Sequence, residues 1–355
     1  MSYTLSPDQA RALTAIGTWY RGKEKPYLTL GGYAGTGKTT LIALLRQALQ
    51  EYNPDTKVAF CAYTGKAAQV LRSKLREHKV LRKGDNVSTI HSLIYNNKTD
   101  KQGHTSWVRK DELKFDLLIV DEASMVDEFI WQDLLAFGLP ILAVGDHGQL
   151  PPVNSRFNLM AEPELRLEQI FRQEAQSAII KVALLARMYG HIPVEEFGPG
   201  VAKLNRTDSE TGQTVEDMLR GWNNDMLVLC GYNHTRTSLN AHIRALRDIE
   251  NPEPTTGDVV VCLRNSRTDH LYNGQIGTIM SIEPSPDDPN NEWYWADIYF
   301  DSEKSRYSGY VLREQFGAKE TIKQPPKAPG DSTGALFDFG YALTVHKAQG
   351  SQAKQ

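Results

Sequence analysis

A glycine-rich segment, Gly32-Tyr33-Ala34-Gly35-Thr36-Gly37-Lys38-Thr39, carries the residues with the clearest chemistry in the sequence. Repeated glycines let the backbone curl so that its N–H groups point at an anion, and a following helix adds the positive end of its dipole. An apolar run precedes the segment at residues 27–30, and a helical pattern follows it at 41–49. This order predicts a phosphate-binding loop rather than a simple turn. The predicted triphosphate ligands are Gly32, Gly35, Thr36, Gly37, Lys38, Thr39 and Thr40, with Lys38 on the outer phosphates and Thr39 on Mg²⁺.

Two adjacent carboxylates, Asp121 and Glu122, end an apolar run at residues 117–120. Beside a triphosphate, Asp121 is expected to hold Mg²⁺ and Glu122 to orient and deprotonate the attacking water. The pair could also cap a helix, but the phosphate loop upstream favours catalysis. A third apolar run, residues 141–144, leads to Asp146 and to Gln149, which can sense a γ-phosphate. Asp146 either caps its own loop or joins the metal network, and the sequence leaves both open.

Gln9 and Arg172 are two further candidates for the nucleotide site. Gln9 lies in a predicted helix that Ser6 caps and Pro7 begins. Its amide can donate and accept at once, as the edge of adenine requires. Arg172 follows the last strand expected in the first domain, and it stabilises charge on the transferred phosphoryl group if it reaches across a cleft. Otherwise it is a surface arginine.

The elements that position these residues are short, continuous apolar runs, which are typical of buried parallel strands. In open α/β sheets ligands bind at the carboxyl ends of the strands. After the run at 58–62, Thr64 and Lys66 can therefore take a second anion, or they can belong to an ordinary capped turn.

Two other segments have a different pattern. The polar stretch 96–114, flanked by Tyr95, predicts an inserted hairpin with a turn at Gln102-Gly103. An exposed aromatic there, Tyr95 or Trp107, can stack on a base for about 1–3 kcal/mol, and the alternative is a solvated loop with Trp107 packed on the domain surface. Residues 259–300 are β-rich and interrupted by Gly, Pro and Asn, which indicates a small barrel. Trp293 and Trp295 share one face of a predicted strand, where core packing is favoured over base stacking.

Composition limits the possible classes of protein. The chain has 355 residues, of which 40% are hydrophobic and 23% charged, as in a globular enzyme of several domains. Its formal net charge of −3 means that nucleic-acid binding needs a local track of Lys and Arg. Cys61, Cys230 and Cys262 lie in apolar runs without CxxC spacing, which predicts buried free thiols, no disulfide and no zinc site. The N-terminus lacks the pattern of a signal peptide, and no run has eighteen apolar residues, so we expect an intracellular protein without membrane contact.

Taken together, these motifs resemble those of superfamily 1 DNA helicases of the 5′→3′ branch, in particular the RecD-like and Dda-like enzymes. The resemblance covers nearly the whole chain. Gln9 looks like the adenine-contacting glutamine, and residues 32–39 are similar to Walker A, 62–68 to motif Ia, 88–92 to motif Ib, 121–125 to the DEAS form of Walker B, 145–152 to motif III, 171–173 to motif IV and 343–352 to motif V.

The resemblance implies an α/β P-loop NTPase with two RecA-like motor domains that hydrolyse ATP, with Mg²⁺, at the cleft between them. It places motor domain 1A at 1–92 and 116–170, hairpin 1B at 93–115, motor domain 2A at 171–255 and 335–355, and an SH3-like 2B insertion at 256–334. Gly350 joins the nucleotide ligands, and the residues implied to contact single-stranded DNA are Thr64, Lys66, His91, Asn233, Thr344, His346 and Lys347.

The implied activity is 5′→3′ translocation on single-stranded DNA with unwinding of duplexes, in replication, recombination or repair. Implied partners are single-stranded DNA and its junctions with duplex, with a single-strand-binding protein or other replication proteins left open. The resemblance further implies a monomer in the cytoplasm, which is the host cytoplasm if a phage encodes the chain.

The sequence departs from this family after Gln352, because no motif VI arginine follows and motor domain 2A is expected to be incomplete. An arginine finger contributes about 10³–10⁵ in rate. The alternative is therefore an ATP- and single-strand-binding protein with little turnover. A second rival is an unrelated P-loop enzyme such as a small-molecule kinase, which leaves residues 344–351 unexplained.

Overall fold

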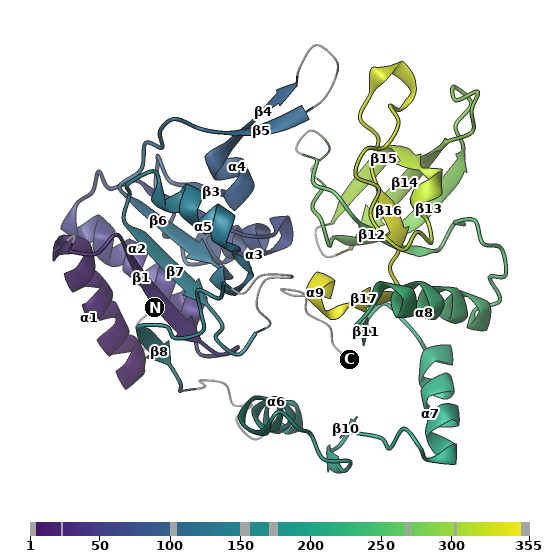
Figure 1. Ribbon diagram of the computed structural model, residues 1–355, viewed down its shortest axis with the longest axis horizontal. Coiled ribbons are helices and arrows are strands. Elements are labelled where there is room, and N and C mark those ends of the chain that lie inside the picture. Colours follow the sequence, from purple (N-terminus) through teal and green to yellow (C-terminus); the bar gives the residue numbers. More distant parts are fainter. Residues whose placement is uncertain are drawn as a thin grey trace. The chain divides into compact units, whose positions relative to one another are not determined.

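A computed structural model describes residues 5–22, 24–99, 105–149, 157–169, 177–266, 269, 271–301 and 304–348. The chain forms two compact units, residues 1–203 and residues 204–355 (Figure 1). Within the described ranges, no helix has the length and apolar character needed to cross a membrane.

A six-stranded sheet forms the centre of the first unit, and all its described pairings are parallel. Three of its four inner strands, β2, β6 and β7, are buried at every position, as their continuous apolar runs predict. The strand order is β3-β2-β6-β7-β1-β8, with β1 Tyr27–Gly32, β2 Val58–Ala62, β3 Asn86–Thr89, β6 Leu117–Asp121, β7 Ile141–Gly145 and β8 Leu165–Leu167.

Helices cover both faces of this sheet (Figure 1). One hydrophobic core joins the sheet to α1 (Pro7–Gly22), α2 (Lys38–Tyr52) and α3 (Gly65–Glu77). The other core joins it to α4 (Ile90–Ile94) and α5 (Glu128–Leu135), with the short 3₁₀ helix η1 (Ala123–Met125) between β6 and α5. The predicted start of the first helix is confirmed, because α1 begins at Pro7 and the Ser6 hydroxyl accepts a hydrogen bond from the Gln9 amide at 3.1 Å.

An antiparallel hairpin extends from the first unit, with strands β4 (Tyr95–Thr99) and β5 (Thr105–Arg109). It lies within the segment where the sequence predicts an insertion, although the expected turn at Gln102-Gly103 is outside the described residues. The Tyr95 hydroxyl donates to Asp133 of α5, which ties the base of the hairpin to the domain. Helix α6 (Ala178–Tyr189) and strands β9 (Glu196–Gly198) and β10 (Val201–Ala202) complete the unit.

The second unit contains two sheets. Strands β11 (Val228–Cys230) and β17 (Ala342–Thr344) form a parallel pair next to α7 (Ser209–Arg220), α8 (Asn233–Leu246) and α9 (Val345–Ala348). The other sheet is antiparallel, in agreement with the predicted β-rich region. Its order is β15-β14-β13-β12-β16, with β12 Val259–Cys262, β13 Ile276–Pro284, β14 Trp293–Phe300, β15 Ser305–Leu312 and β16 Phe337–Phe339, and the 3₁₀ helices η3 (Arg313–Gln315) and η4 (Pro329–Asp331) lie between β15 and β16.

Two buried ion pairs connect α8 to the elements around the antiparallel sheet. Arg236 Nη1 lies 2.6 Å from Asp338 of β16, and Arg244 Nε lies 2.9 Å from Asp258 just before β12. Because a buried charge without its partner is costly, these pairs specify how α8 docks. Arg236 and Arg244 of α8 therefore have a structural role.

Two predictions about side-chain burial need correction. Trp293 is in the core with 1% of its surface exposed, whereas Trp295, expected to pack with it, is 40% exposed and makes an edge contact with Tyr310. Cys61 and Cys262 are buried as expected, but Cys230 is only half-buried, because its short two-stranded sheet leaves β11 partly open. All three thiols are free.

Candidate functional site

The phosphate loop connects β1 to α2 and needs its glycines for two reasons. Gly35 and Gly37 both have φ of +82°, a backbone conformation that side chains with a Cβ disfavour. A Cβ at Gly37 would also lie 2.4 Å from Gln9 Nε2. That amide donates to the Thr36 carbonyl at 2.9 Å, and Gln9 Oε1 accepts from the Ser6 amide at 3.2 Å. The structure therefore places Gln9 directly against the loop, where it supports the backbone.

Lys38 folds back onto the loop that carries it. Its Nζ donates to the carbonyls of Gly32 at 2.7 Å and Tyr33 at 3.1 Å. The Thr36 hydroxyl also donates to the Tyr33 carbonyl, at 2.8 Å. Thr39 and Thr40 follow in the first turn of α2 and are partly exposed. A bound phosphate can replace these two carbonyls as the partner of the Lys38 ammonium, because a hydrogen bond to an anion is stronger than one to a carbonyl.

Asp121 and Glu122 leave β6 two strands away from β1, with β7 between them. Burial raises the pKa of Asp121, while the Glu122 amide, which donates to Asp121 Oδ1 at 3.0 Å, and the Lys38 charge oppose that shift. Burial, and then the Asp121 charge, raises the pKa of Glu122 to about 7. Glu122 has φ of 52°, and its buried Oε2 has no hydrogen-bond partner in the described structure. A buried acid with an unused oxygen suits a site that receives a cation and a water.

The loop after β7 brings Gln149 to the same place. Gln149 hydrogen-bonds with the Glu122 carboxylate, and its Oε1 accepts from the Ser124 hydroxyl at 3.2 Å. Asp146, 2% exposed, accepts from the Gly148 amide at 2.8 Å, so it caps its own loop. Its charge also contributes to the raised pKa of Glu122. Lys38, Asp121, Glu122 and Gln149 therefore share one edge of the sheet, as predicted.

Sequence reasoning missed Ser124 and His147. Ser124 orients Gln149, and it is 2% exposed. The His147 ring lies 4.2 Å from the Tyr33 ring of the phosphate loop, and its Nδ1 is buried without a described hydrogen-bond partner. Ser124 lies in the segment similar to Walker B, and His147 lies in the segment similar to motif III. Their positions in these motifs could have indicated that they lie near the site, but the sequence does not show which residues they contact.

Thr64, Lys66 and His91 occupy the far end of the same edge, after β2 and β3. The Thr64 hydroxyl accepts from the Ala67 amide at 3.1 Å and so caps α3. The His91 ring contacts the rings of Tyr63 and Tyr95, with centroids 6.1 and 5.8 Å apart. Burial lowers the pKa of His91, with an opposing effect of Asp127. The sequence predicts either an anion contact or an ordinary capped turn at Thr64, and the structure shows the cap. The cap does not prevent an anion from binding at the same turn.

The second unit collects another predicted group. Cys230 of β11 is in register with Thr344 of β17, so Asn233, soon after β11, and Thr344, which ends β17, lie at neighbouring carboxyl ends. Asn233 and His346 are exposed, and Lys347 is half-buried. Burial, followed by the Arg236 charge, lowers the pKa of Lys347 to about 8. Arg172 and Gly350 lie outside the described residues.

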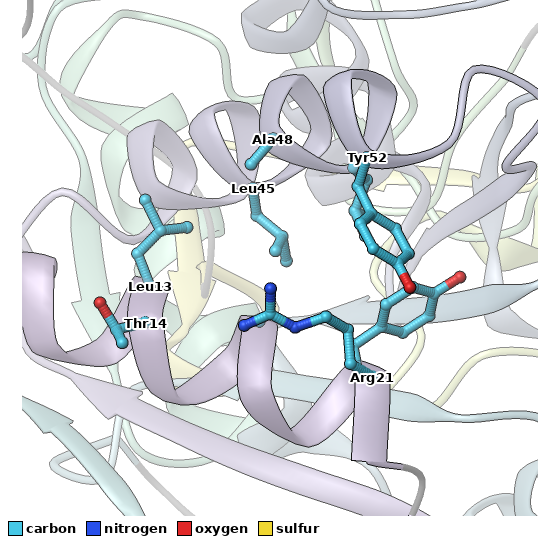
Figure 2. Close-up of a pocket in the computed structure, with 9 residues that line it drawn as sticks. Leu13, Thr14, Arg21, Leu45, Ala48 and Tyr52 are labelled. Atoms are coloured by element: carbon cyan, nitrogen blue, oxygen red, sulfur yellow. The ribbon is translucent and has the colours of Figure 1, made fainter.

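A cavity of about 260 Å³ lies between α1 and α2, but it is separate from the phosphate loop. Figure 2 shows Leu13, Thr14 and Arg21 of α1 opposite Leu45, Ala48 and Tyr52 of α2. Since a helix turns once every 3.6 residues, these α2 residues lie about two to four turns beyond Lys38. The cavity therefore takes no part in the nucleotide site.

The glycine loop, the paired carboxylates and the parallel sheet between helices define a P-loop NTPase. A family model described as an AAA domain matches residues 4–197, and the chain belongs to this family. The resemblance to superfamily 1 RecD-like helicases is confirmed by its relatives among characterised proteins.

Three relatives illustrate this similarity. The ATP-dependent RecD2 DNA helicase of Deinococcus radiodurans is 29% identical over 354 residues, which cover 92% of this chain and 42% of the relative. The ATP-dependent DNA helicase dda of phage T4 is 34% identical over 37% of this chain and 29% of the relative. The RecBCD enzyme subunit RecD of Buchnera aphidicola is 32% identical over 42% of this chain and 28% of the relative. The chain thus spans less than half the length of these relatives.

Solved structures support the fold. Bacteroides Pif1 bound to single-stranded DNA matches with a TM-score of 0.53 and 17% identity, covering 98% of this chain and 84% of that one. A structure of two coordinating Pif1 helicases at forked DNA matches with a TM-score of 0.56 and 16% identity, covering 99% and 85%. At such identities the similarity concerns the architecture alone.

Proposed function

We propose that this chain is an ATP-dependent DNA helicase that moves 5′→3′ along single-stranded DNA and unwinds duplex. The observation that carries the proposal is the shared edge where Lys38, Asp121, Glu122 and Gln149 meet. The order of motifs along the chain and relatives named as RecD2 and Dda helicases support the extension from nucleotide hydrolysis to DNA.

The residues have distinct roles in this proposal. The loop amides and Lys38 bind the triphosphate, and Gln149 positions the attacking water together with Glu122, which takes its proton. Arg172 stabilises the transferred phosphoryl group, and Gly350 joins the nucleotide ligands. The buried acids of this edge suit Mg²⁺, which Thr39 and Asp121 would hold and which supplies neutralising charge to the phosphates when bound.

Single-stranded DNA is proposed to follow the other end of the same edge and its counterpart in the second unit. Thr64, Lys66 and His91 lie beyond the parallel strands β2 and β3, and a ring cluster of Tyr63, His91 and Tyr95 offers surfaces for stacking. The second group consists of Asn233, Thr344, His346 and Lys347. Contacts of this kind are largely independent of base sequence and weaken with salt.

The deciding experiment measures ATP hydrolysis with and without single-stranded DNA, and then unwinding of duplexes that carry a 5′ or a 3′ tail. We expect DNA to stimulate hydrolysis and only the 5′-tailed duplex to be unwound, with Lys38→Ala as the inactive control. Hydrolysis that ignores DNA would point to a different P-loop enzyme. Unwinding from a 3′ tail alone would contradict the proposed direction.

Replacing Gln9 separates adenine recognition from loop support. In the structure each end of the Gln9 amide uses one hydrogen-bonding position, on Thr36 and Ser6, and each end has another position available. We expect Gln9→Ala to raise KM for ATP about tenfold, because a buried hydrogen bond to the base is lost, and to raise KM for GTP much less. Steady-state hydrolysis with both nucleotides checks this, and an equal rise for both would leave Gln9 as a loop support only.

A further inference from the structure

An arginine that no motif contains reaches the phosphate loop from helix α6. The helix has apolar residues along its length but no buried side chain, and Arg187 in its last turn is half-buried. The Arg187 guanidinium carbon lies 4.2 Å from the centre of the Tyr33 ring. Tyr33 is the second residue of the phosphate loop, so α6 contacts the loop through this cation–π pair.

The loop after β7 is shaped around the same guanidinium. A Cβ added at Gly148 would lie 2.9 Å from Arg187 Nε and 3.2 Å from Tyr33 Cε1. His147 stacks at a tilt of 42° on Tyr33, with 4.2 Å between centroids. The guanidinium therefore contacts both the phosphate loop and the loop after β7. The second of these loops also carries Gln149, which hydrogen-bonds with Glu122.

The charges around Arg187 indicate an anion as its partner. Among the described residues no carboxylate forms an ion pair with Arg187. Burial lowers the pKa of His147, the Asp146 charge opposes this shift, and Arg166, Arg187 and Lys38 each add a smaller lowering effect. Three cations around one ring with the single carboxylate of Asp146 leave an excess of positive charge, which a bound anion offsets. The buried, unpartnered Nδ1 of His147 is a further polar atom at this place.

We propose that Arg187 binds the outermost phosphate of the nucleoside triphosphate and so distinguishes it from the diphosphate. This inference rests on the proposed function, since it assigns a ligand contact within the same site. A planar guanidinium stacked on Tyr33 is pre-organised for a phosphate, which lysine reproduces in charge but not in geometry.

The test compares binding of a fluorescent non-hydrolysable ATP analogue and fluorescent ADP to the full chain. We expect Arg187→Ala to weaken the triphosphate about tenfold and ADP less than about twofold, because one charge-assisted contact to the last phosphate is lost. Arg187→Lys should recover part of the affinity. Lys181→Ala is the matched control, since Lys181 lies on the same helix with its own cation–π contact, to Phe197.

Three outcomes are decisive. Selective loss of triphosphate affinity with partial rescue by lysine supports the proposal. Equal weakening of both nucleotides, or no difference from Lys181→Ala, overturns it even if Lys38→Ala abolishes binding. If Lys38→Ala leaves nucleotide binding intact, the proposed function itself fails, and that result is separate from the behaviour of Arg187.

Discussion

Glu122→Gln is expected to lower ATP turnover by about 10²–10⁴ while nucleotide binding persists, because the amide keeps the shape of the carboxylate but cannot take a proton. The structure supplies the reason for so large an effect. Glu122 has a pKa of about 7 owing to burial and to Asp121, and its unpartnered Oε2 leaves an acceptor for water. Single-turnover hydrolysis and equilibrium binding of an ATP analogue measure the two properties separately.

The same variant should change the pH dependence of the rate. A base acts only when ionised, so kcat/KM of the unaltered chain should rise as pH passes upward through about 7, and this limb should vanish in Glu122→Gln. Glu128→Gln, on the exposed first turn of α5, is the control and should keep both rate and limb. A rate for Glu122→Gln within a factor of about three of the control would remove Glu122 from the chemistry.

Stability gives an independent check with a defined sign. The folded-state pKa of Glu122 is raised above its ordinary value of 4.5. Its contribution therefore favours folding below about pH 4.5 and is lost as pH rises through about 7. Glu122→Gln should accordingly have a higher Tm than the unaltered chain at pH 8, and this gain should shrink toward pH 5. Thermal unfolding at the two pH values measures it.

The first unit could be predicted well from the sequence because its signals are local. Continuous apolar runs correspond to β2, β6 and β7, and Ser6-Pro7 marks the start of α1. Parallel strands place their carboxyl ends on one edge, so Lys38, Asp121 and Gln149 could be brought together without coordinates. The domain boundaries and the roles of the DNA-contact candidates stay predictions.

Other features depend on long-range packing, which single-sequence patterns do not encode. Trp293 and Trp295 share a strand face in a two-residue period, yet Trp293 belongs to a core cluster with Leu263, Ala328 and Leu336, and Trp295 is exposed. The contact of Arg187 with Tyr33 joins segments that no local spacing relates, and no residue pattern marks the positive φ of Glu122. The hydrogen bonds of Lys38 to its own loop could not be predicted either, because the motif describes only the role of this lysine with nucleotide bound.

A buried ion pair behind the site leads to the second large effect, on stability. Arg46 of α2 and Asp85, which precedes β3, have side chains 0% and 1% exposed, with Nε 2.8 Å from Oδ2. Asp85 also accepts from the amides of Val58 at 3.0 Å and Arg82 at 2.9 Å. The pair thus connects the helix after the phosphate loop to the strands that lead to Thr64 and His91.

Arg46→Ala should lower the free energy of unfolding of the first unit by about 3–5 kcal/mol, because it leaves Asp85 charged and buried without its partner. Hydrogen exchange of the β2 and β3 amides measures this free energy locally, and the β14 amides of the second unit serve as an internal reference. Lys74→Ala is the matched control, since it removes an exposed pair with Glu77, for which about 0–1 kcal/mol is expected. If both variants lowered the protection of the β2 amides equally, the Arg46–Asp85 pair would not specifically stabilise the contact of α2 with β2 and β3. A selective loss with Arg46→Ala would instead show that the helix after the phosphate loop and the strands that precede Thr64 and His91 are energetically coupled through one buried charge pair.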